Sequence, residues 1–273
     1  MKILITVLLA ALLTLTAFTF RDEEEYRMIT HTGFALNENL EFEVSYGLIN
    51  AGTAIVQTHS SYYKVNGRPC YKIDVFGNSK GALEVVAKIR DHWGAYVDTA
   101  SIVPHISFRN ILEGGYRHNE IVRFDHNTDM VEAKTFNFKE NHFREPMYHK
   151  APENIMDMIS GYCYLRTIDY SKLSIGDTLT LSTFFEDSFY DLKILFGGRE
   201  NLKTKFGKVK SIILIPIMPD NKIFAGENSI TAWFSDDENK IPLKVKAELF
   251  VGSAEVNLDK YQGLKKDLKF IKD

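Results

Sequence analysis

Three oxygen-bearing side chains with the spacing of a calcium loop are the first chemical signal in the sequence. Asp125, Asn127 and Asp129 would fill positions one, three and five of such a loop. The sixth position is Met130 instead of glycine, and the twelfth is Phe136 instead of glutamate, which excludes an EF-hand. A polar turn between two strands is the better interpretation of this segment.

Other residues of metal-ligand type lack the spacing of a metal centre. Asp236, Asp237 and Glu238 form an acidic run that suits a solvated turn, although such a run could hold a hard cation loosely. The eight histidines are scattered, without a His-Glu-x-x-His or Cys-x-x-Cys pattern. We therefore expect neither a metal nor a cofactor.

No catalytic nucleophile can be assigned from its neighbours. Ser160-Gly161 lacks the glycine two residues before the serine that a nucleophile elbow requires, because Met158 stands there. The paired carboxylates of a glycosidase are defined by their separation in space, so the sequence leaves that chemistry open. We expect a protein without enzymatic activity and assign no catalytic residue.

The two cysteines, Cys70 and Cys163, have two interpretations. In an oxidising compartment an isolated pair is a disulfide candidate. Two unrelated buried thiols are the alternative, because a bridge needs Cα atoms within about 7 Å. If they pair, the strand at residues 70–76 must lie near a helix at residues 153–168.

The element that would position much of the chain is a hairpin at residues 230–258. Residues 243–249 alternate between apolar and charged side chains, which is typical of a strand with one buried and one solvated face. Residues 235–240 form a polar turn, and residues 230–234 form the strand that enters it. We expect Trp233 to be mostly buried with its indole N–H on a polar partner, and Pro242 to begin the second strand.

Similar short strands fill most of the remaining chain. Residues 40–46 alternate cleanly, and Asn66-Gly67 predicts a tight hairpin turn before the strand at residues 70–76. Helical spacing of apolar residues appears in two places, residues 81–89 and residues 153–168. The fold class is therefore mainly β, with two short helices.

The chain start predicts export. Met1-Lys2 followed by the apolar residues 3–20 has the form of a signal peptide with cleavage near residues 17–20, and no cysteine stands nearby for lipid attachment. We divide the chain into a signal peptide (1–20), an acidic flexible lead (21–32), a single β-rich domain (33–262) and a C-terminal tail (263–273). We expect the mature protein to be periplasmic, soluble and without a transmembrane segment.

Composition excludes some partners. The sequence is 45% hydrophobic and 25% charged, which is ordinary for a globular protein. Loss of Lys2 with the signal leaves 33 − 1 = 32 basic against 36 acidic residues, a formal net charge of −4. This balance gives no electrostatic reason to bind nucleic acid or anionic lipid.

An ordered set of motifs also resembles a known family. The set begins with the 15 residues from Leu40 to Ala54, LEFEVSYGLINAGTA, continues with Arg90-Asp91 and Asp157-x-x-Ser160-x-x-Tyr-x-x-Arg166, and ends with Trp233-x-Ser-Asp-Asp-x-x-x-Ile-Pro242. This order resembles the exported family called domain of unknown function 3108, over about residues 33–260. The family-like positions are Gly47, Gly52, Asp91, Asp98, Asp157, Arg166, Trp233, Asp236, Asp237 and Pro242.

The resemblance implies a Gram-negative cell-envelope protein with a long, strongly curved antiparallel sheet, similar to the half-open barrels of lipoprotein carriers. It implies no activity. Three hypotheses follow: a carrier that binds an apolar, lipid-like or amphipathic ligand on the concave sheet, an assembly module that contacts another envelope protein, and a glycan-active enzyme. An open apolar cavity favours the first, a filled core the second, and convergent carboxylates the third.

Overall fold

Strands dominate the computed structural model, which describes residues 26–86, 88–218 and 225–272. Within these residues sixteen strands belong to one antiparallel sheet. They are β1 (Asn39–Tyr46), β2 (Ile49–Thr58), β3 (Tyr63–Val65), β4 (Arg68–Ser79), β5 (Arg90–Asp98), β6 (Pro104–Glu113), β7 (Tyr116–Asp125), β8 (Met130–Asn137), β9 (His142–Phe143), β10 (Met147–Lys150), β11 (Thr178–Phe185), β12 (Ser188–Thr204), β13 (Gly207–Pro216), β14 (Ile230–Ser235), β15 (Pro242–Glu248) and β16 (Ser253–Gln262).

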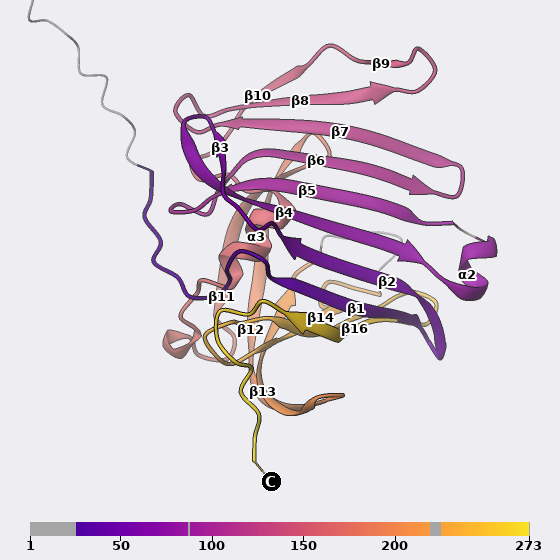
Figure 1. Cartoon of the computed structure of the whole chain (residues 1–273), viewed down its shortest axis with the longest axis vertical. Coiled ribbons are helices and arrows are strands. Elements are labelled where there is room, and N and C mark those ends of the chain that lie inside the picture. The colour runs from indigo at the N-terminus through magenta and orange to yellow at the C-terminus, as the bar shows by residue number, and fades with distance from the viewer. Residues whose placement is uncertain (1–25, 87, 219–224, 273) are drawn as a thin grey trace, which may run out of the picture.

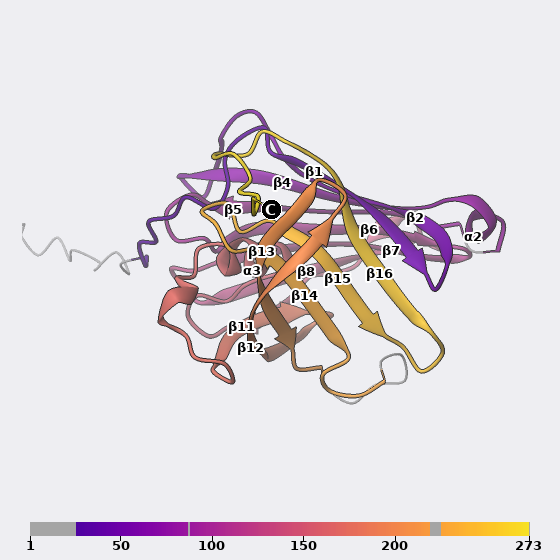
Figure 2. The ribbon, with the colours of Figure 1, turned by 90° about the horizontal axis from the view of Figure 1, so that it is seen from below.

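The sheet is strongly curved and does not close. Its order is β10-β8-β7-β6-β5-β4-β2-β1-β16-β15-β14-β13-β12-β11, with β3 on β4 and β9 on β8. Pairing of β1 with β16 joins the two halves of the chain. The halves then curl toward each other around helix α3 (Met158–Leu165), as Figures 1 and 2 show. The predicted half-open antiparallel sheet is confirmed.

Side-chain alternation gives the sheet an apolar inner face. In β1, Leu40 and Phe42 are buried, whereas Glu41 and Glu43 lie on the other face. The inner face carries four apolar clusters, and α3 contacts two of them from within the curve: Ile159 and Cys163 pack toward β4 and β5, while Leu165 packs toward the opposite half. This helix is the main cover of the inner face.

Local turn chemistry agrees with the strand pattern. Asn66 and Gly67 both have positive φ, 51° and 79°, as the predicted tight turn between β3 and β4 requires. The segment that resembled a calcium loop is the turn between β7 and β8. Asp129 there has a φ of 50°, which asparagine and aspartate adopt more readily than most residues.

Both helices are shorter than predicted. Helix α2 spans Gly81–Val86 instead of residues 81–89, because Ile89 already pairs with Glu113 in extended conformation. Helix α3 begins at Met158 instead of residue 153, because Met156 makes backbone hydrogen bonds with β11 and pairs with Thr183. A 3-10 turn, η1 (Tyr170–Lys172), follows α3.

The segments flanking the sheet pack against it. In the expected flexible lead, Arg27 donates to the Ser101 carbonyl at 2.8 Å, and the Ile29 amide donates to the Ala100 carbonyl at 2.8 Å. In the expected tail, Leu268 is buried in an apolar cluster. The predicted signal peptide, residues 1–20, lies outside the described residues. None of the described helices has the length and apolarity needed to cross a membrane.

Candidate functional site

An apolar cavity lies between the inner face of the sheet and α3. Its volume is about 330 Å³. It is lined by Ala54 and Val56 of β2, Val75, Phe76 and Gly77 of β4, Asp91 and Trp93 of β5, and Met158, Ile159 and Tyr162 of α3. Among the described lining residues Asp91 alone is charged, so the cavity suits an apolar molecule with little polar character.

Strand register places the cavity walls. Val75 pairs with Trp93 between β4 and β5, and Val56 pairs with Val75 between β2 and β4, so these three side chains share the inner face. These three side chains form one wall of the cavity, and Met158, Ile159 and Tyr162 of α3 form the facing wall. Met158, the first residue of α3, is 47% exposed at the edge of the cavity.

A capping box fixes the end of α3 that borders the cavity. The Ser160 amide donates to Asp157 Oδ1 at 2.8 Å, and the Asp157 amide donates to Ser160 Oγ at 3.0 Å. Burial raises the pKa of Asp157, and the hydrogen bonds from Ser160 and the helix amides, which lower the pKa, offset only part of this rise. Asp157 therefore serves as the N-cap of α3, with its carboxylate occupied by hydrogen bonds to the helix.

Two carboxyl groups lie together at the edge of the cavity. Asp91 Oδ1 accepts from the Leu112 amide at 3.1 Å. Burial raises the pKa of Glu113, and the charge and hydrogen bond of Asp91 raise it further. The two carboxyl groups therefore lie close enough to interact, and Asp91 is the one that lines the cavity.

A buried ion pair lies next to the cavity on the inner face. Arg109 Nε donates to Glu120 Oε2 at 2.8 Å, and the guanidinium lies against Phe185 and Trp93 at 4.5 and 5.3 Å. The remaining space between these residues and α3 is about 20 Å³. Sequence reasoning missed this pair, because Arg109 and Glu120 come from neighbouring strands and only their register brings them together.

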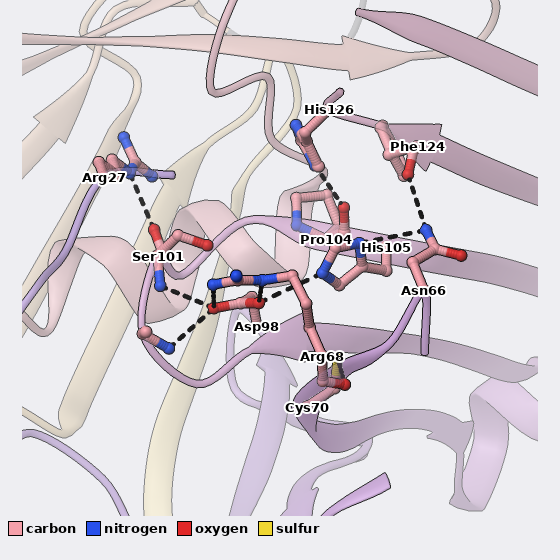
Figure 3. A network of polar contacts seen from close by, with 11 residues as sticks. Arg27, Asn66, Arg68, Cys70, Asp98, Ser101, Pro104, His105, Phe124 and His126 are labelled. Carbon is pink, nitrogen blue, oxygen red and sulfur yellow. Dashed lines mark hydrogen bonds and ion pairs between the residues drawn. The ribbon is translucent and has the colours of Figure 1, made fainter. Parts of the chain in front are cut away.

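A second polar network, drawn in Figure 3, is centred on Asp98 at the end of β5. Its carboxylate accepts from Arg68 and His105, and from the Ala100 and Ser101 amides at 2.9 and 2.8 Å. The His105 ring lies between Asn66 and Asp98, with Nδ1 3.3 Å from Asn66 Nδ2 and Nε2 3.3 Å from Asp98 Oδ2.

The Asp98 network is electrostatically satisfied. Burial would raise the pKa of Asp98, but the hydrogen bonds from His105, Arg68 and the two amides outweigh it and hold the pKa far below its usual range. The side chains of Asp98 and His105 are fully buried. The network therefore fixes the β5–β6 connection and offers no reactive group to a substrate.

A third cluster lies on the outer face of β4 and β5. Asp74 contacts Lys72 Nζ at 2.6 Å, His59 Nε2 at 2.5 Å and His92 Nε2 at 2.9 Å. Burial would raise the pKa of Asp74, but hydrogen bonds from these three partners lower it overall. No group of three metal-ligating residues with suitable geometry occurs in the described parts of the chain. We interpret the cluster as structural, because hydrogen bonds to the Asp74 carboxylate join β4 to β5 and to the segment before β3.

Comparison with known proteins decides the family. The model of the family described as "Protein of unknown function (DUF3108)" matches residues 41–259. The chain belongs to this family. No curated protein matches the sequence of this DUF3108 member.

Solved structures share the fold at very low sequence identity. The DUF3108 chain is similar to a "Beta-barrel-like Protein of Domain of Unknown Function DUF1849" from Brucella abortus, with 8% identity and a TM-score of 0.55, covering 87% of this chain and 99% of that one. A "putative lipoprotein" from Parabacteroides distasonis covers 87% of this chain and 100% of its own, with 10% identity and a TM-score of 0.29. The first likeness supports the half-open barrel fold.

Several family-like positions of this DUF3108 chain hold the sheet together. Gly47 has a φ of 56° in the β1–β2 turn. A Cβ on Gly52 would lie 2.3 Å from the Asn78 carbonyl oxygen of β4, which leaves no room for a side chain. Arg166, 1% exposed, donates to both carboxylate oxygens of Glu38 and to the carbonyl oxygens of Gly33 and Asn239.

The β14–β15 turn differs from its expected solvated form. Asp237 accepts from Ser235 Oγ at 2.8 Å and from the Asn239 and Lys240 amides at 3.0 and 3.2 Å, so it caps the turn. Asp236 forms ion pairs with Arg199 at 3.1 Å and Lys210 at 3.4 Å. Both aspartates are therefore engaged within the chain.

Most of the Trp233 surface is covered, as predicted. The residue lies between buried Ala232 and Phe234 in β14, so its side chain points to the outer face of the sheet. Its Nε1 donates to Glu200, which confirms the expected polar partner. Pro242 is the first residue of β15, also as predicted.

The cysteines are free and buried. Tyr71 packs in the same inner cluster as Cys163, and its neighbour Cys70 therefore points to the opposite face of β4. The Cys70 thiol donates instead to the Arg68 carbonyl at 3.6 Å. Burial raises the pKa of Cys70 to about 12, which makes it a poor nucleophile. Of the two interpretations, this arrangement favours two unrelated buried thiols over a disulfide.

Proposed function

We propose that this chain is an exported, periplasmic protein without enzymatic activity that holds an apolar or amphipathic ligand against the inner face of its sheet. The observation that carries the proposal is the cavity of about 330 Å³ beneath α3, lined by apolar side chains except for Asp91. Small-molecule sites occupy roughly 300–1,000 Å³ and are mostly apolar with a few polar groups. This cavity volume suits a molecule with a single alkyl chain better than a lipid with several chains.

The polar edge of the cavity favours an amphipathic ligand. Asp91 lines the cavity and Glu113 lies close to it, so two carboxyl groups stand where the apolar lining ends. A hydroxyl or amine on the ligand would donate to this pair while an apolar chain lies along Val56, Val75 and Trp93. Exposed Met158 is flexible enough to adapt to such a chain.

Binding of a fluorescent apolar probe tests the cavity. N-phenyl-1-naphthylamine, whose emission rises in apolar surroundings, should bind the wild-type chain saturably and be displaced by fatty acids or alkyl amines. Ala54→Phe fills the cavity and should weaken binding by at least about tenfold. Ile55→Phe adds a large ring to the outer face of the same strand and should leave binding unchanged. Equal binding by both variants would refute the proposed site.

An assembly module is the second candidate function, and the sheet edge supports it. Strand β10 ends the sheet, and its Met147 and Tyr148 are 44% and 61% exposed. Such an edge could pair with a strand of another envelope protein. Crosslinking from Tyr148 in cells would capture a discrete partner under this hypothesis and none under the carrier hypothesis.

A further inference from the structure

Two hairpin turns carry large apolar side chains that are exposed to solvent. Leu48 and Ile49 of the β1–β2 tip are 104% and 56% exposed. Phe250 and Val251 of the β15–β16 tip are 65% and 76% exposed. Turns normally carry glycine, asparagine, aspartate, proline or serine, so fold requirements do not explain these four residues, which we call the apolar tips.

Strand pairing makes the two tips one surface. Strand β1 pairs with both β2 and β16, which brings the hairpins side by side. The Gly47 amide donates to the Ser253 carbonyl at 3.0 Å, and Tyr46 Oη donates to the Val251 carbonyl at 2.6 Å. The apolar tips are therefore held in a fixed relation by hydrogen bonds beneath them.

The tips lie at one end of the molecule. Figures 1 and 2 place the β1–β2 turn and α2 at the end away from the C-terminus, and Figure 2 shows the β15–β16 turn there too. Val85 of α2 adds an 89% exposed side chain at this end. The β14–β15 turn at the opposite end is closed by Asp237 and packs against the C-terminal segment. The two ends thus differ in polarity.

We propose that the apolar tips insert into the interfacial region of a lipid bilayer and dock this end of the protein on the membrane. The tips are narrow and convex, and a fluid apolar phase accommodates such protrusions without a matching pocket. Lys80 lies beside the β1–β2 hairpin, where its amide donates to the Ala51 carbonyl at 2.8 Å, and its exposed ammonium forms no ion pair with a described residue. This charge complements anionic headgroups.

Two acids near the tips are paired within the chain: Glu84 with Arg90, and Glu248 with Lys246 at 2.6 Å. Exposed Glu43 accepts a hydrogen bond from Asn50 at the base of the β1–β2 tip, and its charge opposes anionic headgroups. Membrane affinity would then come mainly from apolar burial, with Lys80 adding a smaller electrostatic part. The inference is independent of the cavity, because vesicle binding needs the tips whether or not a ligand is present.

Vesicle co-sedimentation tests the inference with the full chain recovered from the soluble fraction of cells that produce it. Vesicles of phosphatidylcholine, with and without phosphatidylglycerol, are compared. Leu48→Ser/Phe250→Ser should lower binding by about tenfold or more per side chain. The control Ile175→Ser removes a 77% exposed side chain from the loop between η1 and β11 and should bind like wild type. Urea unfolding of all three proteins should coincide, since these side chains are exposed.

Insertion depth is read separately from affinity. Phe250→Trp should show a blue-shifted emission component on addition of vesicles, whereas Ile175→Trp should show none. Failure of wild type to sediment with either vesicle type would overturn the inference. Undiminished binding of the double variant, or equal spectral shifts from both tryptophans, would do the same.

Discussion

Arg166→Met removes a buried guanidinium and leaves its partner without a counter-charge. The side chains of Arg166 and Glu38 are 1% and 2% exposed, and Nη2 lies 2.8 Å from Glu38 Oε2. Removing one partner of a buried pair typically costs about 3–5 kcal/mol, because the other charge stays buried. The carbonyl oxygens of Gly33 and Asn239 also lose their donor.

A cost of about 3–5 kcal/mol is large against a total stability of roughly 5–15 kcal/mol. It corresponds to a decrease in melting temperature of about 6–20 °C for a chain of this size. Urea unfolding monitored by circular dichroism measures the free energy of unfolding directly. Adding Glu38→Gln to Arg166→Met should recover part of the loss, because the uncompensated carboxylate is then neutral.

The matched control is Arg199→Met. Arg199 is 32% exposed, pairs with Asp236 and donates to the Tyr170 carbonyl at 2.8 Å, so its loss should cost about 1–2 kcal/mol, well below the cost of Arg166→Met. An Arg166→Met cost as small as the control's would refute the structural role assigned to this family-like position. A ligand-binding defect without loss of stability would then identify Arg166 as a functional residue.

Three further outcomes follow from the structure. In urea unfolding, Asp237→Ala should lower the free energy of unfolding by about 2–3 kcal/mol, because Asp237 accepts hydrogen bonds from a side chain and two amides of its turn. Asp236→Ala should lower it by less than about 1 kcal/mol, because Asp236 makes surface ion pairs. Equal losses in the two variants would contradict this. Burial lowers the pKa of His31 to about 4, with added effects of nearby cations. The unfolded state therefore binds this proton first, so the His31 contribution should be full above about pH 6.5 and fall by about 2 kcal/mol, after allowance for the partial exposure of the ring, as the pH drops toward 4. His31→Phe should remove this part of the pH dependence and leave the part due to His126, whose pKa burial also lowers. Alkylation in urea without reductant should modify both Cys70 and Cys163, whereas protection of both would indicate a disulfide.

The sequence predicted the sheet well because its signals are local. Alternating residues 40–46, the Asn66-Gly67 turn and Pro242 at a strand start each depend on nearest neighbours, and all three appear as expected. The start of α3 was misplaced because the apolar spacing extends back to residue 153, whereas the capping box at Asp157 and the pairing of Met156 with β11 determine the boundary.

The candidate site was beyond sequence reasoning. The cavity needs β2, β4, β5 and α3 together, and their contacts join residues as distant as Ala54 and Tyr162. Which face Trp233 occupies depends on the register of β14, which places Ala232 and Phe234 inward. The Arg109–Glu120 pair likewise becomes visible only when β6 and β7 are aligned.

Native mass spectrometry of the protein, purified gently from the cells that produce it, tests the central claim most directly. We expect wild type and Ile55→Phe to carry a bound apolar or amphipathic molecule, and Ala54→Phe to lack it. A wild-type chain that arrives without ligand, or an Ala54→Phe variant that carries the same adduct, would contradict a ligand site beneath α3.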